Sequence, residues 1–144
     1  MKLKLDNELV ADAFFENTWL LGIVAPLEAH QFVWHVNNTL RFDLRINNSL
    51  EIQLVKKNRN YFFPVYTFHE PLQALEYFLY KNVFDGEYLL PEFRHLDYLL
   101  LAKGDLPDAS AFQNLQQALR QINGVQLVVE LAHEKIKNRQ HLVL

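Results

Sequence analysis

The chain has 144 residues, of which 50% are apolar and 22% are charged, with a net charge of −3 and no cysteine. This composition excludes intrinsic disorder, and the lack of cysteine excludes disulfides, thiolate nucleophiles, iron–sulfur clusters and cysteine-bearing zinc sites. No apolar run approaches the roughly 20 residues that span a bilayer, and acidic residues stand where a signal peptide is basic, so we expect one cytoplasmic domain over residues 1–144.

The first predicted elements are a strand and a helix. Residues 18–25 form a continuous apolar run, which is typical of a buried strand, and Pro26 suits the first position of a helix. The helix that follows carries apolar residues at helical spacing, which predicts one buried face: Ala29, Phe32, Val33, Val36 and Leu40.

A run of strands is predicted next. Alternation at 50–54, a polar turn at 56–60 and an aromatic, β-branched stretch at 61–68 indicate two strands joined by a turn. Pro64 has no N–H to donate, so it predicts a sheet edge or a bulge in the second of them.

Two more strands are predicted around a tight turn. Residues 75–82 form an aromatic-rich strand, and Asp85-Gly86 is a hairpin signal that leads into residues 88–90. Residues 96–103 indicate a further strand, which Gly104 closes.

The last elements are a helix and a strand. The helix is predicted to begin near Asp105, with Pro107 and Asp108 in its first turn, and to end at a Gly124 cap. Its apolar face holds Ala111, Phe112, Leu115, Ala118, Leu119 and Ile122. Residues 125–131 then alternate as a strand does, so the element order predicts an α+β fold with a single mostly antiparallel sheet and two main helices packed on one face.

Several kinds of chemistry are missing from the sequence. The four glycines lie too far apart for a phosphate-binding loop, and neither Ser49 nor Ser110 stands in a serine hydrolase motif. None of the six histidines completes a metal-binding pattern, because His133-Glu134 lacks a second histidine and Glu92-x-x-His95 has no second copy. We therefore expect no metal site and no cofactor.

A basic turn beside aromatic residues offers one nucleic-acid hypothesis. Lys56, Lys57 and Arg59 could bind phosphates, and the aromatic side chains at 61–63 could stack on bases. The chain is negative overall and Pro64 interrupts the strand, so a solvated hairpin turn is the favoured interpretation.

Trp34 lies off the apolar stripe of the first predicted helix, on a line with Leu27 and His30. It either belongs to a widely buried helix or faces a protein partner. We favour burial, and partner contact is the alternative.

Residues 90–98 are the most distinctive segment, with the sequence Leu-Pro-Glu-Phe-Arg-His-Leu-Asp-Tyr. It resembles the motif that names the IPExxxVDY family of small bacterial proteins, with Leu90 in place of isoleucine and Leu96 in place of valine. The residues that match the motif are Pro91, Glu92, Asp97 and Tyr98. The resemblance implies no particular activity, because none is established for that family.

The motif places an acid in an apolar strand. If that strand starts near Leu96, Leu96 and Tyr98 share one face and Asp97 lies on the other. A buried carboxylate needs hydrogen bonds, so Asp97 is predicted to accept bonds from turn N–H groups or to pair with Arg94 or Arg45.

Two roles remain open for the motif acids. In the structural one, which we favour, Glu92 fastens the same turn as Asp97. In the catalytic one, Glu92 and Asp97 act as acid and base, with Tyr98 or His95 assisting.

The sequence thus predicts a small binding or interaction protein without catalysis. The alternative is an enzyme of unassigned reaction that uses a Glu92/Asp97 carboxylate cluster, and nucleic-acid binding ranks third. An unknown protein partner, with Trp34 as its candidate contact, is the alternative to burial of that side chain, and we expect neither a membrane nor a nucleic acid.

Overall fold

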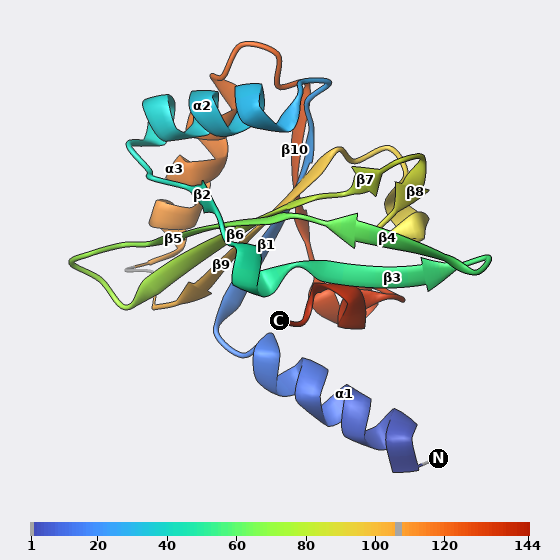
Figure 1. Ribbon diagram of the computed structural model, residues 1–144. Helices are drawn as coiled ribbons and strands as arrows, with labels where there is room; N and C mark the ends of the chain where they lie inside the picture. Colours follow the sequence, from blue (N-terminus) through green and yellow to red (C-terminus); the bar gives the residue numbers. More distant parts are fainter. Residues whose placement is uncertain (1, 106–107) are drawn as a thin grey trace.

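An antiparallel sheet of six strands forms the centre of the protein (Figure 1). The computed structural model describes residues 2–105 and 108–144. In spatial order the strands are β10 (Leu127–Leu131), β1 (Thr18–Val24), β9 (Tyr98–Gly104), β6 (Leu75–Lys81), β5 (Val65–His69) and β2 (Arg45–Ile46). The predicted α+β class with a single main sheet is confirmed.

Two helices cover one face of this sheet, α2 (Ala29–Leu40) and α3 (Ala109–Arg120). Their apolar side chains pack against alternate residues of the strands, including Leu21, Leu100 and Val128. Seven predicted core residues are buried: Phe32, Val33, Val36, Phe112, Leu115, Leu119 and Ile122. Ala29 is half-buried. The prediction that both helices pack on one face is confirmed.

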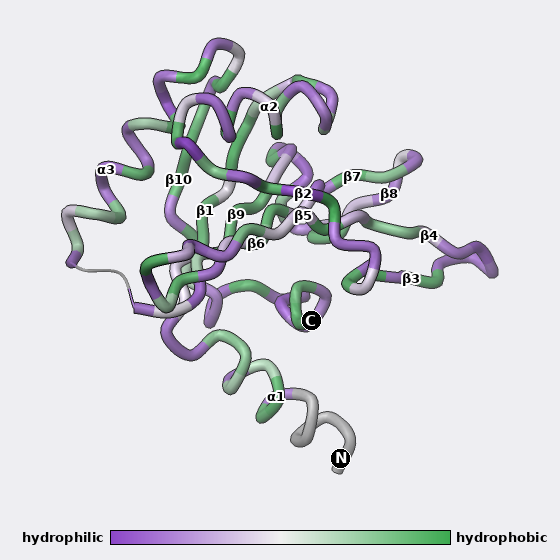
Figure 2. Tube along the Cα trace, turned by 60° about the vertical axis from the view of Figure 1, so that its left-hand side comes forward, coloured by the Kyte–Doolittle hydropathy of each residue, from purple (hydrophilic) through white to green (hydrophobic). Residues whose placement is uncertain are grey.

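The opposite face carries a second core, which was not predicted from the sequence. It is covered by the two-stranded sheet of β3 (Ile52–Lys56) and β4 (Arg59–Phe63), by α1 (Lys2–Phe14) and by the C-terminal segment with its 3₁₀ turns η3 (His133–Lys135) and η4 (Arg139–Leu142). Figure 2 shows the hydrophobic residues of β1 and β9 between the two covering layers. A continuous apolar run such as β1 is therefore buried on both sides, as such runs require.

The two faces of β9 differ from the predicted assignment at one residue. Tyr98 and Leu100 face the helices, whereas Leu99 and Leu101 face the second core. Leu96 also lies in the second core, so its predicted shared face with Tyr98 is wrong. The strand begins only at Tyr98, because the Leu96 N–H donates to the Phe93 carbonyl (3.0 Å) and residues before Asp97 form a turn.

Both helices begin later than predicted. α2 begins at Ala29 rather than Pro26, since residues 25–28 form a turn and Glu28 is the N-cap. α3 begins at Ala109, where the Asp108 carboxylate caps it by accepting from the Ala111 N–H (2.9 Å). The predicted role of Pro107 lies outside the described residues.

The end of α3 and the start of β3 also differ from the prediction. α3 ends at Arg120 with Gln121 as its C-cap, so Gly124 lies in the following turn rather than at the cap. Leu50 belongs to the 3₁₀ turn η1 (Asn48–Leu50), and the strand starts at Ile52.

Pro64 divides the aromatic stretch 61–68 into two strands. β4 ends at Phe63 and pairs with β3, whereas β5 begins at Val65 and pairs with β6 and β2. A proline supplies no ladder donor, so the chain changes sheets at this residue instead of bulging.

The predicted hairpin at Asp85-Gly86 is confirmed. Both residues have positive φ, as a two-residue turn between β7 (Val83–Phe84) and β8 (Glu87–Tyr88) requires.

In the described part of the chain, no helix is long and apolar enough to cross a membrane.

Gly104 provides a test of the β6–β9 junction. It has a φ of 127°, and a Cβ there would collide with the Ala74 carbonyl oxygen. We expect Gly104→Ala to lower the free energy of unfolding by more than about 3 kcal/mol. Gly86→Ala is the control, because Gly86 also has positive φ but faces open space, and it should cost only about 1–2 kcal/mol. Urea denaturation measures both, and equal losses would contradict the steric explanation.

Candidate functional site

The motif segment connects the β7–β8 hairpin to β9. Pro91 opens the 3₁₀ turn η2 (Pro91–Phe93), where its fixed φ suits the first helical position. The Phe93 N–H donates to the Leu90 carbonyl (2.9 Å), which closes the turn. The motif is thus a compact turn followed by a buried strand.

The buried amide of Asn82 holds this turn in place. Its Nδ2 donates to the carbonyls of Phe93 and Leu96, both at 2.9 Å, and its Oδ1 accepts from the Leu90 N–H at 2.9 Å. Its own N–H donates to the Asp97 carbonyl (2.9 Å). The Asn82 side chain is therefore hydrogen-bonded to both ends of the turn. Buried backbone groups that no strand pairs need such partners.

From the sequence, Asn82 is predicted only as the last residue of a strand, and this role is not predicted. The available signal was a single amide at the end of an aromatic strand, directly before a hairpin. Which backbone groups it would meet depends on a turn that begins eight residues later along the chain.

Asp97 ties the start of β9 to the end of β1. Its Oδ2 accepts from the Ala25 N–H (2.8 Å), and its own N–H donates to the Ile23 carbonyl (2.8 Å). Of the two predicted kinds of partner, the turn N–H is confirmed.

Neither predicted arginine pairs with Asp97. Arg94 lies over the ring of Tyr88, with its guanidinium carbon 5.8 Å from the ring centre. Arg45 pairs with Asp43 at 3.0 Å. Each arginine therefore contacts a side chain other than Asp97.

Glu92 fastens its turn to the C-terminal segment rather than to the turn that Asp97 holds. Its carboxylate accepts from the backbone N–H of Asn138 (2.8 Å) and from the Asn138 Nδ2 (3.1 Å). Partial burial opposes ionisation, but hydrogen bonds from its own backbone and from Asn138, together with nearby His141, outweigh this effect and lower the pKa of Glu92. Glu92 is therefore a charged anchor.

Tyr98 links β9 to the chain before α2. Its ring stacks on Phe32 with the ring centres 4.3 Å apart, and its hydroxyl donates to the Leu27 carbonyl (2.5 Å). Burial, together with the charge of Asp97, raises the pKa of Tyr98 well above its usual range. The phenol is thus neutral, and its hydroxyl proton forms the hydrogen bond that holds the chain before α2.

A hollow of about 290 Å³ lies beside Asp97 and Tyr98 and is also lined by Pro26, Glu28 and Lys81. Glu92 is not among its lining residues. The two motif acids therefore hold different parts of the chain, and the geometry gives the paired-carboxylate hypothesis no shared site.

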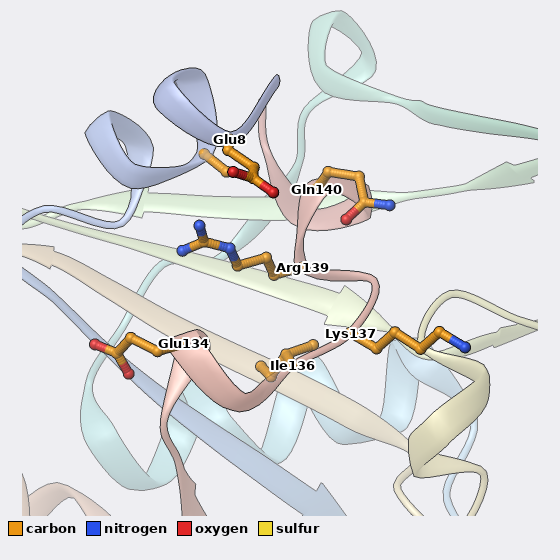
Figure 3. A pocket seen from close by; sticks show the side chains of 7 residues that line it. Glu8, Glu134, Ile136, Lys137, Arg139 and Gln140 are labelled. Carbon is orange, nitrogen blue, oxygen red and sulfur yellow. The ribbon is translucent and has the colours of Figure 1, made fainter. Parts of the chain in front are cut away.

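A second hollow, of about 400 Å³, separates α1 from the C-terminal segment (Figure 3). Arg139 extends toward α1 and pairs with Asp12 (2.6 Å) and with the Nδ1 of His133 (3.0 Å), while Lys137 points the other way. The ring of His133 stacks on Phe15, with the ring centres 4.7 Å apart. The charges of Arg139 and Asp12 neutralise each other, so their ion pair serves to fix α1 to the C-terminal segment.

The basic turn of the nucleic-acid hypothesis is partly neutralised. Lys56 pairs with Glu87 at 3.2 Å, and Arg59 pairs with Asp85.

Among the described residues, no three His, Asp or Glu side chains lie close enough together to hold a metal ion.

Trp34 is 61% exposed, so the favoured prediction of its burial is wrong. The buried face of α2 consists of Phe32, Val33 and Val36, which point toward the sheet, and Trp34 lies on the solvent side. Its nearest aromatic neighbour is His35, at 5.0 Å between ring centres. α2 is therefore buried along a stripe and not around its circumference.

Comparison of the sequence with models of protein families gives no match, and comparison with curated proteins gives none either. Membership of the IPExxxVDY family stays a prediction from residues 90–98.

Removing the Asn82 or Asp97 side chain tests the structural role of the motif. Asn82→Ala removes three hydrogen bonds and leaves two buried backbone groups, the Leu90 N–H and the Leu96 carbonyl, without partners, because the Phe93 carbonyl still accepts from the Leu96 N–H. We expect it to lower the free energy of unfolding by about 3 kcal/mol or more. Asp97→Ala leaves one such group and should cost about 1–3 kcal/mol.

The measurement is the denaturant midpoint at an unchanged m-value. Asp43→Ala is the control, since it removes an exposed acid and should cost less than about 0.5 kcal/mol. An unchanged midpoint for Asp97→Ala would instead indicate that the carboxylate serves a ligand.

The lowered pKa of Glu92 predicts a pH dependence. Its contribution to stability is complete above the unfolded value of 4.5 and is lost as the pH falls through the lower folded value. We therefore expect Glu92→Gln to lose less stability than the natural chain when the pH falls below about 4.5. Denaturant midpoints between about pH 3 and 7 measure this, and parallel profiles would contradict it.

Proposed function

We propose that this protein is a binding module without catalysis, whose contact surface for another protein is the solvent side of α2, with Trp34 at its centre. The exposure of that indole carries the proposal. A tryptophan that is 61% exposed leaves a large apolar area in water, and tryptophan is enriched among the side chains that dominate interface energies.

The composition of α2 supports an interface. From Ala29 to Leu40 the helix contains no Asp, Glu, Lys or Arg, although its solvent side is exposed at His30, Gln31, Trp34 and Asn38. The solvent side of a helix is ordinarily charged, whereas the centre of an interface is depleted of charge.

The surface is also rigidly supported. Tyr98 bonds the chain directly before α2, and the Asn37 side chain bonds both backbone groups of Leu44, accepting from its N–H (2.8 Å) and donating to its carbonyl (3.1 Å). Such a face loses little conformational freedom when a partner binds.

The alternative is an enzyme that uses Glu92 and Asp97. The contacts of these acids do not favour it, since each acid accepts from a backbone N–H of a different segment. A bacterial origin, a cytoplasmic location and the resemblance to the IPExxxVDY family remain part of the proposal.

Site-specific photocrosslinking in living cells tests the surface. A photoreactive amino acid replaces Asn38, which lies one turn from Trp34, and as a control replaces Gln113, which is exposed on α3. The proposal requires a defined crosslinked protein from position 38 that does not form from position 113. Equal crosslinking at both positions, or none at either, would overturn it.

Trp34→Ala separates binding from stability. Because the side chain is exposed, we expect the free energy of unfolding to change by less than about 0.5 kcal/mol. The crosslink from position 38 should disappear in this variant. A stable variant that still forms the crosslink would show that Trp34 is not the anchor.

A further inference from the structure

The outer edge of β3 has no strand beside it. β3 pairs with β4 on one side, and the sheet that they form has only these two strands. Figure 1 shows β3 at the front of the molecule with β4 on only one side of it. An unpaired edge presents a row of free N–H and carbonyl groups to other strands.

The hairpin turn identifies which of those groups are free. Lys57 and Asn58 both have positive φ and form a two-residue turn closed by the Lys56–Arg59 pair. The closing pair of such a turn is hydrogen-bonded, and bonded pairs alternate along an antiparallel ladder. Leu54 and Ile52 therefore bond to β4, whereas Gln53 and Val55 direct their backbone groups outward.

The far edge of the main sheet shows the contrast. The guanidinium of Arg120 donates to the outward carbonyl of Val128 in β10 (3.0 Å), which blocks that edge. No comparable bond from a described residue reaches the backbone of Gln53 or Val55. Instead, a groove of about 380 Å³ runs along residues 49–54, with C-terminal residues such as Gln140 and Leu144 as its other wall.

We propose that the protein forms a two-fold symmetric dimer in which β3 pairs antiparallel with β3 of a second copy. The register sets Leu54 opposite Leu54 of the partner, so that Gln53 and Val55 of opposite copies exchange hydrogen bonds. Such an interface is isologous: Leu54 meets its own copy on the two-fold axis, and every other contact occurs twice. Val55, which is 65% exposed, becomes part of a continuous four-stranded surface.

Charge complementarity selects a second copy as the occupant. In this register Glu51, the residue directly before β3, lies near Lys57 of the partner, the residue directly after β3. Among the described residues neither side chain makes an ion pair, whereas the neighbouring Lys56 and Arg59 are already paired within the chain. The strand is thus acidic at its start and basic at its end, which an antiparallel copy of itself matches.

The dimer does not depend on the proposed function. β3 and β4 cover the face of the main sheet opposite α2, so both copies leave Trp34 exposed. Failure of one proposal would therefore leave the other standing.

The test measures the mass of the full chain by sedimentation equilibrium over roughly 1 to 500 µM. The natural chain should show a monomer–dimer equilibrium. Gln53→Pro removes the outward N–H without touching the bonds to β4, and it should abolish the dimer. Gln53→Thr keeps that N–H and should retain it. A chain that stays monomeric throughout, or a dimer that survives Gln53→Pro, overturns the proposal.

Charge reversal tests the register independently of folding. Glu51→Lys and Lys57→Glu each place like charges together twice, so each variant alone should dimerise at least about tenfold more weakly. In an equimolar mixture both contacts become complementary, so a one-to-one heterodimer should form with affinity near that of the natural chain. A mixture that stays monomeric, or variants that dimerise normally alone, would overturn this register. Circular dichroism checks that each variant is folded.

Discussion

The architecture depends on one buried amide. Residues 82–97 cross from β6 to β9 through a short hairpin and a 3₁₀ turn, and little regular structure holds them. Asn82 supplies the missing hydrogen bonds from within, because its side chain reaches Leu90, Phe93 and Leu96 together. In a site shielded from water such bonds are strong and their loss is costly, so they fix where β9 begins.

The position of β9 then sets the position of α2. The Asp97 carboxylate accepts from the N–H of Ala25, and the Tyr98 hydroxyl donates to the carbonyl of Leu27. The first two residues after the turn are thus hydrogen-bonded to the chain on both sides of Pro26. The stacking of Tyr98 on Phe32 continues the contact into the helix. The most distinctive motif in the sequence thus orients the helix that presents Trp34, although it lies far from that helix in the chain.

The sheet separates two surfaces with different chemistry. On the helical side, α2 presents an exposed indole on an uncharged face, which suits contact through side chains. On the opposite side, β3 presents free backbone groups between opposite charges, which suits pairing through the main chain. A dimer through β3 would carry two copies of the α2 surface, and two linked copies bind a repeated partner more strongly than one.

The sequence by itself determined the local elements and the class of fold. The apolar run of β1, the helical spacing of Phe32, Val33 and Val36, and the Asp85-Gly86 turn each depend on neighbours in the chain, and local sterics and periodicity are enough to predict them. It also determined that Asp97 needs partners, since a carboxylate among leucines must be bonded. Only the tertiary structure decided which partners these are: Ala25 for Asp97, Asn138 for Glu92, and a turn eight residues away for Asn82. The burial of Trp34 was predicted wrongly for the same reason, because periodicity defines the faces of a helix, whereas packing against the other elements decides which of them is covered.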